Sequence, residues 1–201
     1  MRKLIPKTPP QTARKLPTPR SIIKEPALRN KKKKKLIPLL LLTFTIAGIT
    51  GFLYETACVI LYEGGFYKRG TTFGPWIPIY GFGALMIYAL TVKVRKKPML
   101  VFLIAAISCG LFELVSGFVI DKFFHMRLWD YTGTVLSWGN LNGYICVRSV
   151  VTWGIFGMIL MHVLLPLEEK FQKRFPKAFN IVTFALFGLF ALDIVLSLTI
   201  K

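Results

Sequence analysis

Four ionisable side chains lie inside long apolar stretches of the sequence: Glu55, Glu113, Arg148 and Asp193. A charge at the centre of a membrane helix costs about 3 kcal/mol on insertion scales, so such a group usually faces a partner or a water-filled cavity. Carboxylates and a guanidinium in that setting could hold a polar or anionic group, or carry a proton. We therefore expect the function of the chain to depend on these residues.

The elements that position these residues are membrane helices. Hydrophobic residues make up 54% of the 201 residues, mean hydropathy is +0.55 and only 18% of residues are charged, which is typical of an integral membrane protein. Runs long enough to cross a hydrocarbon core predict an all-α polytopic bundle of about five transmembrane helices. They cover residues 36–62, 76–92, 99–124, 143–166 and 179–200. The second is short and contains Pro78, Gly81 and Gly83, so we expect it to be kinked.

The distribution of Lys and Arg predicts the orientation. Residues 1–35 and the loops 93–97 and 167–178 carry 21 of them, whereas the alternate loops and the C-terminus carry five. Positive residues near helix ends are retained on the cytoplasmic side. We therefore expect a cytoplasmic N-terminus and an extracytoplasmic C-terminus in the cell membrane.

The N-terminal segment, residues 1–35, is rich in Lys, Arg and Pro and has no apolar periodicity, so we predict that it is disordered and cytoplasmic. The remaining residues, 36–201, form the predicted transmembrane domain. The net charge of +18 comes mostly from residues 1–35, so nucleic acid is not the expected partner. The expected partners are anionic lipids of the inner leaflet, which a run of five lysines would contact. Binding of another partner by this run is the alternative. The run comprises Lys31, Lys32, Lys33, Lys34 and Lys35.

The predicted orientation gives each buried charge a depth. At about 1.5 Å of rise per residue, Glu113 and Asp193 lie roughly 21 Å from the cytoplasmic edge, and Glu55 roughly 28 Å. The predicted helix that carries Arg148 starts at the outer edge of the membrane, and Arg148 lies roughly 8 Å below that edge. All four charges are therefore expected in the outer half of the bilayer, whereas the inner half is apolar apart from His162.

The predicted outer loops supply matching polar groups. The first contains Arg69 among several glycines and leads into a Pro- and Gly-rich run with Tyr80, which suits a broken helix that lines a cavity. The second contains Asp130 and Asn142, and we expect both at the mouth of a pocket. Its aromatic residues Trp129 and Tyr131 are typical of the interface belt.

Other chemistry has little support in the sequence. The three cysteines and two histidines have no metal-ligand spacing, so we expect neither a metal nor another cofactor. Phosphate-loop, nucleophile-elbow and zinc-protease motifs are absent from the sequence. If ATP drives the protein, we expect a separate chain to hydrolyse it.

Several motifs in order give the chain a family resemblance. They are FLYE with Glu55, KRGTTFGPWIPIYGFGAL, FELVSGFVIDKFF, WDY, NGYICVRS and WGIFG. Between about residues 48 and 166 the chain resembles the bacterial putative ABC-transporter type IV permeases. This resemblance implies a small multi-pass transporter permease and carries over a set of motif residues. They are Glu55, Arg69, Gly70, Gly74, Pro75, Pro78, Tyr80, Gly81, Glu113, Trp129, Asp130, Asn142, Gly143, Arg148 and Trp153.

The leading hypothesis is a transport component with an outward-facing polar pocket. Its candidate binding residues are Glu55, Arg69, Tyr80, Glu113, Asp130, Asn142 and Arg148. It implies a homo-oligomer or a separate ATPase subunit. One alternative is an outer-leaflet enzyme that acts on a lipid-linked substrate, with Glu55 or Glu113 as general acid or base. Another is a non-catalytic assembly subunit, in which a Glu113 to Arg148 ion pair only fixes helix packing, while Asp193 extends toward the interface.

Overall fold

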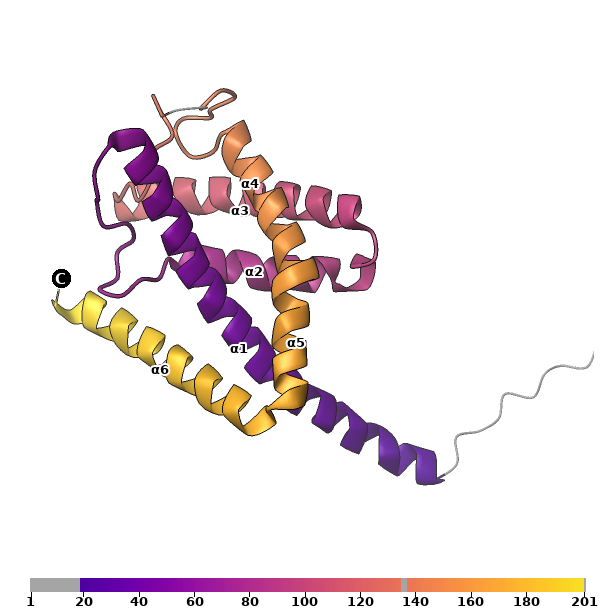
Figure 1. Cartoon of the computed structure of the whole chain (residues 1–201). Helices are drawn as coiled ribbons and strands as arrows, with labels where there is room; N and C mark the ends of the chain where they lie inside the picture. Colours follow the sequence, from indigo (N-terminus) through magenta and orange to yellow (C-terminus); the bar gives the residue numbers. More distant parts are fainter. Residues whose placement is uncertain (1–18, 135–136, 201) are drawn as a thin grey trace, which may run out of the picture. The chain divides into compact units, whose positions relative to one another are not determined.

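The computed structural model describes residues 19–134 and 137–200, and within these residues it is helical without β-strands. Its helices appear in Figure 1. They are α1 (Pro19–Glu63), α2 (Pro78–Thr91), the 3-10 turn η1 (Val92–Val94), α3 (Pro98–Phe124), α4 (Val147–Ile159), the π-helical turn η2 (Leu160–Leu164), α5 (Leu165–Arg174) and α6 (Pro176–Ile200). The predicted all-α membrane bundle is confirmed.

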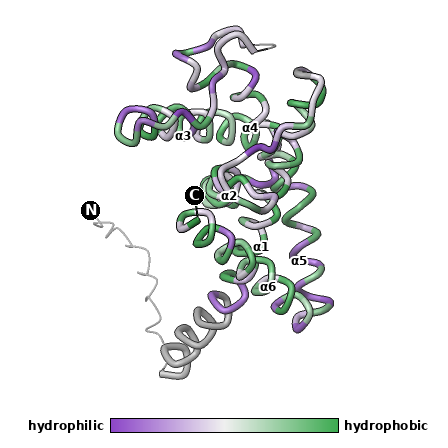
Figure 2. Tube along the Cα trace, turned by 90° about the vertical axis from the view of Figure 1, so that its left-hand side faces the viewer, coloured by the Kyte–Doolittle hydropathy of each residue, from purple (hydrophilic) through white to green (hydrophobic). Residues whose placement is uncertain are grey.

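Among the described residues, four helical stretches are long and apolar enough to cross a membrane. They are Lys33–Tyr62, Pro98–Phe124, Val147–Arg174 and Pro176–Ile200, whereas Pro78–Val94 is apolar but shorter. Figure 2 shows apolar residues along α3 and α6 and hydrophilic residues near the end of α5. The short second helix begins at Pro78, because proline fits the first turn, where its missing N–H has no partner to lose.

Residues Ile37–Lys201 form one compact unit, and all side-chain contacts described below lie within it. The predicted disordered segment, residues 1–35, stays a prediction. Residues 1–18 lie outside the described part of the chain, and α1 begins at Pro19.

The fourth predicted span continues past Pro166, where the sequence suggested its end. The π-helical turn η2 comes just before this proline, and α5 extends the helix to Arg174. A π-turn can absorb the hydrogen bond that proline cannot donate. As a result Glu168, expected in a loop, is only 4% exposed, and its Oε2 accepts a hydrogen bond from the Thr43 hydroxyl at 2.5 Å. The part of the bundle that was expected to be apolar apart from His162 therefore contains a buried carboxylate as well.

Small residues allow the helices around the site to approach closely. Helix α3 packs most extensively on α4. A Cβ atom added to Gly157 of α4 would lie 2.3 Å from the Cβ of Ala105 on α3. Likewise, a Cβ atom on Gly83 of α2 would lie 2.6 Å from the ring of Trp153. Small residues at such contacts are typical of membrane helix interfaces, and here they bring Trp153 against α2.

Candidate functional site

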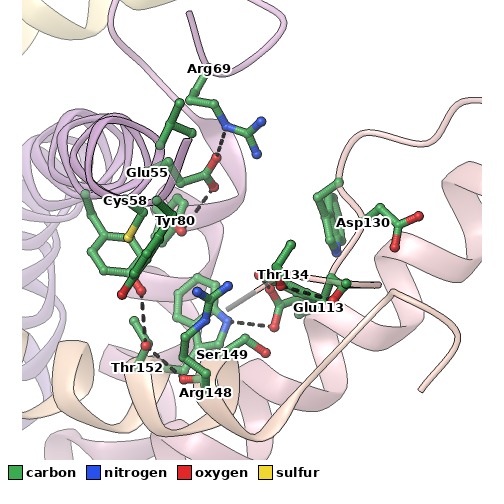
Figure 3. A pocket seen from close by; sticks show the side chains of 17 residues that line it. Glu55, Cys58, Arg69, Tyr80, Glu113, Asp130, Thr134, Arg148, Ser149 and Thr152 are labelled. Atoms are coloured by element: carbon green, nitrogen blue, oxygen red, sulfur yellow. Dashed lines mark hydrogen bonds and ion pairs between the residues drawn. The ribbon is translucent and has the colours of Figure 1, made fainter. Parts of the chain in front are cut away.

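A polar cavity of about 470 Å³ lies between α1, the start of α4, α3 and the two loops 64–77 and 125–146. Its charged lining residues are Glu55, Arg69, Glu113, Asp130 and Arg148. Figure 3 shows their side chains arriving from different segments of the chain, with Arg148 pointing into the cavity. Six of the seven predicted binding residues line this cavity, since Tyr80 does as well.

Glu55 forms the first of two carboxylate centres. The Arg69 Nε donates to its Oε2 at 3.2 Å, and the Tyr80 hydroxyl donates to its Oε1 at 3.1 Å. The Tyr80 ring fits here because α1 has Gly51 opposite it, where an added Cβ would lie 2.2 Å from the ring. On this side of the cavity, the Glu55 carboxylate is therefore already paired with a cation, Arg69.

Glu113 forms the second centre, and its partners are neutral. The Tyr131 hydroxyl donates to Oε1 at 2.7 Å and the Trp153 Nε1 donates to Oε2 at 3.3 Å. The Glu113 to Arg148 ion pair, on which the assembly-subunit alternative depended, is wrong, because no such pair forms between these two described residues. Two aromatic donors satisfy the buried carboxylate instead, and Arg148 is left for other contacts.

Arg148 is held by aromatic rings. Its guanidinium carbon lies 5.7 Å from the ring centroids of both Tyr62 and Tyr131, which is cation–π distance. No carboxylate among the described side chains pairs with it. The Arg148 guanidinium therefore lies at the cavity wall, and none of its N–H donors pairs with an acidic side chain among the described residues.

The start of α4 fixes the direction of Arg148. The Ser149 hydroxyl accepts from the Cys146 backbone N–H at 3.2 Å and donates to the Cys146 carbonyl at 2.9 Å, so it closes the first turn. One turn later, the Thr152 hydroxyl donates to the Arg148 carbonyl at 2.9 Å and lies 3.3 Å from the Tyr54 hydroxyl of α1. These bonds tie the helix that carries the guanidinium to the opposite wall.

The loop 125–146 places Tyr131 over Glu113. Tyr131 N–H donates to the Gly143 carbonyl at 3.0 Å, and Arg127 pairs with Asp130 at 3.1 Å. Gly143 has φ +78°, and a Cβ there would lie 2.1 Å from the Arg127 guanidinium, so only glycine fits. The WDY and NGY motifs of the sequence are therefore explained by the folding of this loop.

Two predicted binding residues have mainly loop roles. The Asp130 carboxylate accepts the Thr132 N–H at 2.7 Å, which lowers the pKa of Asp130, and Figure 3 shows it pointing away from the cavity. Asn142 does not line the cavity: it adopts φ +51°, and its carbonyl accepts from Arg127 at 2.5 Å. The prediction that Asn142 lies at the pocket mouth is therefore not supported by its position in the folded loop.

Tyr131 offers a direct test of the second centre. Burial raises the pKa of Tyr131 well above its ordinary value, so its hydroxyl stays protonated and can donate to Glu113. Replacing Tyr131 with phenylalanine leaves the buried carboxylate without its shorter hydrogen bond, which should lower the free energy of unfolding by about 1–3 kcal/mol. Thermal unfolding in detergent measures this loss. The control is Tyr67→Phe, at an exposed loop tyrosine, and equal stability of the two variants would contradict the arrangement.

Asp193 anchors the loop 64–77 instead of extending alone to the interface. Its Oδ2 accepts from the Gly74 N–H at 3.0 Å and from the Trp76 Nε1 at 2.8 Å. The Ser197 hydroxyl oxygen, one turn further along α6, accepts from the Phe73 N–H at 3.0 Å. The loop that delivers Arg69 to Glu55 is therefore fastened to α6.

Three aromatic residues of the site were not predicted as binding residues from the sequence. Tyr131 and Trp153 donate to Glu113, and Tyr62 stacks on Arg148. Tyr131 was assigned to an interface belt, although its place in the WDY motif beside Asp130 was a usable signal. Trp153 was among the motif residues but had no assigned role.

One of the comparisons with known proteins identifies a family for the chain. A family model described as putative ABC-transporter type IV matches residues 42–198. The match includes most of α6 with Asp193, beyond the region in which sequence motifs carried the resemblance. No curated protein and no solved structure matches the chain.

Proposed function

Because the chain belongs to the putative ABC-transporter type IV family, we propose that it is a permease component whose polar cavity binds an anionic group of its substrate. The observation that carries this proposal is the position of Arg148, a guanidinium at the cavity wall without a carboxylate partner among the described side chains. A guanidinium binds carboxylate or phosphate groups through two parallel hydrogen bonds. The Tyr62 and Tyr131 rings contact the guanidinium without consuming those donors.

The remaining charges of the cavity divide into separate roles. Arg69 is committed to Glu55, so it serves as a counter-ion within the wall. Glu113 faces the same cavity as Arg148 and can accept a hydrogen bond from a hydroxyl group of the substrate. This arrangement argues against a purely structural ion pair, because Glu113 and Arg148 would then be bonded to one another.

The charge distribution of the sequence supports an outward-facing cavity, a cytoplasmic N-terminus and an extracytoplasmic C-terminus. We also propose a separate ATPase subunit as the energy source, since the sequence has no phosphate-binding loop. Lys31 to Lys35 would then lie against the anionic inner leaflet.

Small ions at constant ionic strength test the proposal. Acetate and inorganic phosphate should raise the unfolding temperature of the purified full-length protein, because a ligand that binds only the folded state stabilises it by mass action. Methylammonium, of opposite charge, should not. Stabilisation by methylammonium alone, or by none of the three, would count against an anion site.

A further inference from the structure

A second cavity of about 190 Å³ lies directly beside the polar one and has a different character. It runs between α1, α2 and the continuous helix α4–η2–α5, and its wall includes Ala47, Gly51, Ala84, Phe156 and Leu160. The hydroxyl of Thr50, a polar group on this wall, already donates to the Ile46 carbonyl at 2.8 Å. An apolar cavity whose polar groups are satisfied does not hold ordered water, so hydrocarbon is the kind of group that suits it.

Tyr80 and Trp153 line both cavities and form the boundary between them. Their polar ends face the polar cavity, where the Tyr80 hydroxyl donates to Glu55 and the Trp153 Nε1 donates to Glu113. Their rings pack against each other at 5.0 Å and against Phe156 at 5.9 and 6.4 Å. A single aromatic wall therefore separates a charged compartment from an apolar groove.

The groove extends away from the polar cavity along the fourth helical stretch. From Trp153 to Leu167 the helix rises about 21 Å, a large part of a hydrocarbon core of about 30 Å. At its far end Val163 is 52% exposed and Leu167 is 59% exposed, although both line the groove. In a membrane these residues face lipid, so a chain can enter the groove sideways from the bilayer.

We propose that the ligand is an anionic amphiphile with one hydrocarbon chain. Its carboxylate or phosphate head binds Arg148, and its chain lies in the groove against Phe156 and Leu160. This inference rests on the proposed anion-binding role of the polar cavity and names the substrate class. The adjoining cavities supply the two complementary environments that such a molecule needs, and the shared aromatic wall marks where head and chain meet.

Photolabelling tests the position of the chain. The full-length protein in phosphatidylcholine nanodiscs is irradiated with palmitate that carries a diazirine at mid-chain, and labelled peptides are mapped by mass spectrometry. Label should concentrate on groove residues such as Thr50 and Leu164. Unlabelled palmitate and hexadecyl phosphate should each reduce it by about fivefold or more, whereas hexadecanol, which has the chain without the charge, should not.

Two matched substitutions separate groove binding from ordinary lipid contact. Val163→Phe fills the groove and should lower specific labelling by about fivefold or more, because added volume displaces the chain. Ile155→Phe adds volume on the same helical stretch at a residue that is 47% exposed and lines neither cavity. It should label like the wild type.

The outcomes distinguish this inference from the proposed function. Label that is spread evenly over lipid-facing helices and is unchanged by Val163→Phe would overturn the proposal of an amphiphilic ligand. The proposed anion site would still stand if acetate and phosphate stabilise the protein. Equal competition by hexadecanol would also overturn it, because the charge would then be irrelevant. Absence of both groove labelling and stabilisation by small anions would overturn the two proposals together.

Discussion

Replacement of Arg148 by glutamine is expected to weaken binding of a small anion about 30-fold or more, since two hydrogen bonds from a charged donor contribute about 2 kcal/mol or more. Glutamine keeps much of the length of the side chain but loses the charge and the forked donor pair. Isothermal titration of the purified protein with phosphate measures the change. Arg148→Lys should be intermediate, because it keeps the charge without the fork.

The matched control for Arg148 is Arg174→Gln. Arg174 lies at the end of α5, over the Phe175 ring, and does not line the polar cavity. Its removal takes away the same charge and should leave phosphate affinity unchanged. Equal losses in the two variants would mean that net charge, and not a site at Arg148, sets the affinity.

Replacement of Gly157 by alanine is expected to destabilise the fold by about 1–3 kcal/mol, the usual cost of overpacking. The added Cβ would lie 2.3 Å from the Cβ of Ala105, so α3 and α4 must separate or shift. Since α3 carries Glu113 and α4 carries Arg148 and Trp153, anion binding should fall as well. Thermal unfolding in detergent gives the stability change.

Two further variants make this packing prediction specific. The double variant Gly157→Ala with Ala105→Gly moves the methyl group across the interface and should recover most of the lost stability. Gly188→Ala adds a methyl group in α6 where no atom lies within 4 Å, and it should stabilise the protein slightly through the lower entropy of the unfolded chain. If Gly157→Ala behaved like Gly188→Ala, the close approach of α3 and α4 would be wrong.

The membrane bundle could be predicted because the length of an apolar run is a direct consequence of bilayer thickness. The end of the fourth span could not, because Pro166 is a strong signal for a helix end and only tertiary structure stabilises the π-helical turn before it. That difference explains why Glu168 was placed in a loop although it is buried beside Thr43.

Much of the candidate site followed from residue type and depth. Helical rise gives the level of a residue in the membrane, so the convergence of Glu55, Glu113 and Arg148 on one cavity could be anticipated. It does not give the direction in which a side chain points. The alternative with an ion pair between Glu113 and Arg148 is wrong for that reason. The Glu113 carboxylate accepts hydrogen bonds from Tyr131 and Trp153 instead.

Residues whose partners lie in loops were harder to interpret, because their roles depend on backbone conformation. Asn142 looked like a binding residue, yet its left-handed backbone and carbonyl serve the turn that carries Gly143. Asp193 looked isolated, yet it holds the loop that brings Arg69 to Glu55. Asn142 acts through its own backbone carbonyl, whereas Asp193 accepts from a backbone N–H and an indole, and sequence spacing reveals neither role.

The native Cys58 provides the most direct measurement of the central proposal, an outward-facing cavity that binds anions at Arg148. Cys58 lines the polar cavity and is half-buried, whereas Cys109 and Cys146 are buried. Membrane-impermeant methanethiosulfonates, one anionic and one cationic, are added outside intact cells, with Cys58→Ser as the background. We expect Cys58 to react from outside, faster with the anionic reagent, and to lose that preference in Arg148→Gln. Reaction only in inverted vesicles, or a preference for the cationic reagent, would contradict the proposal.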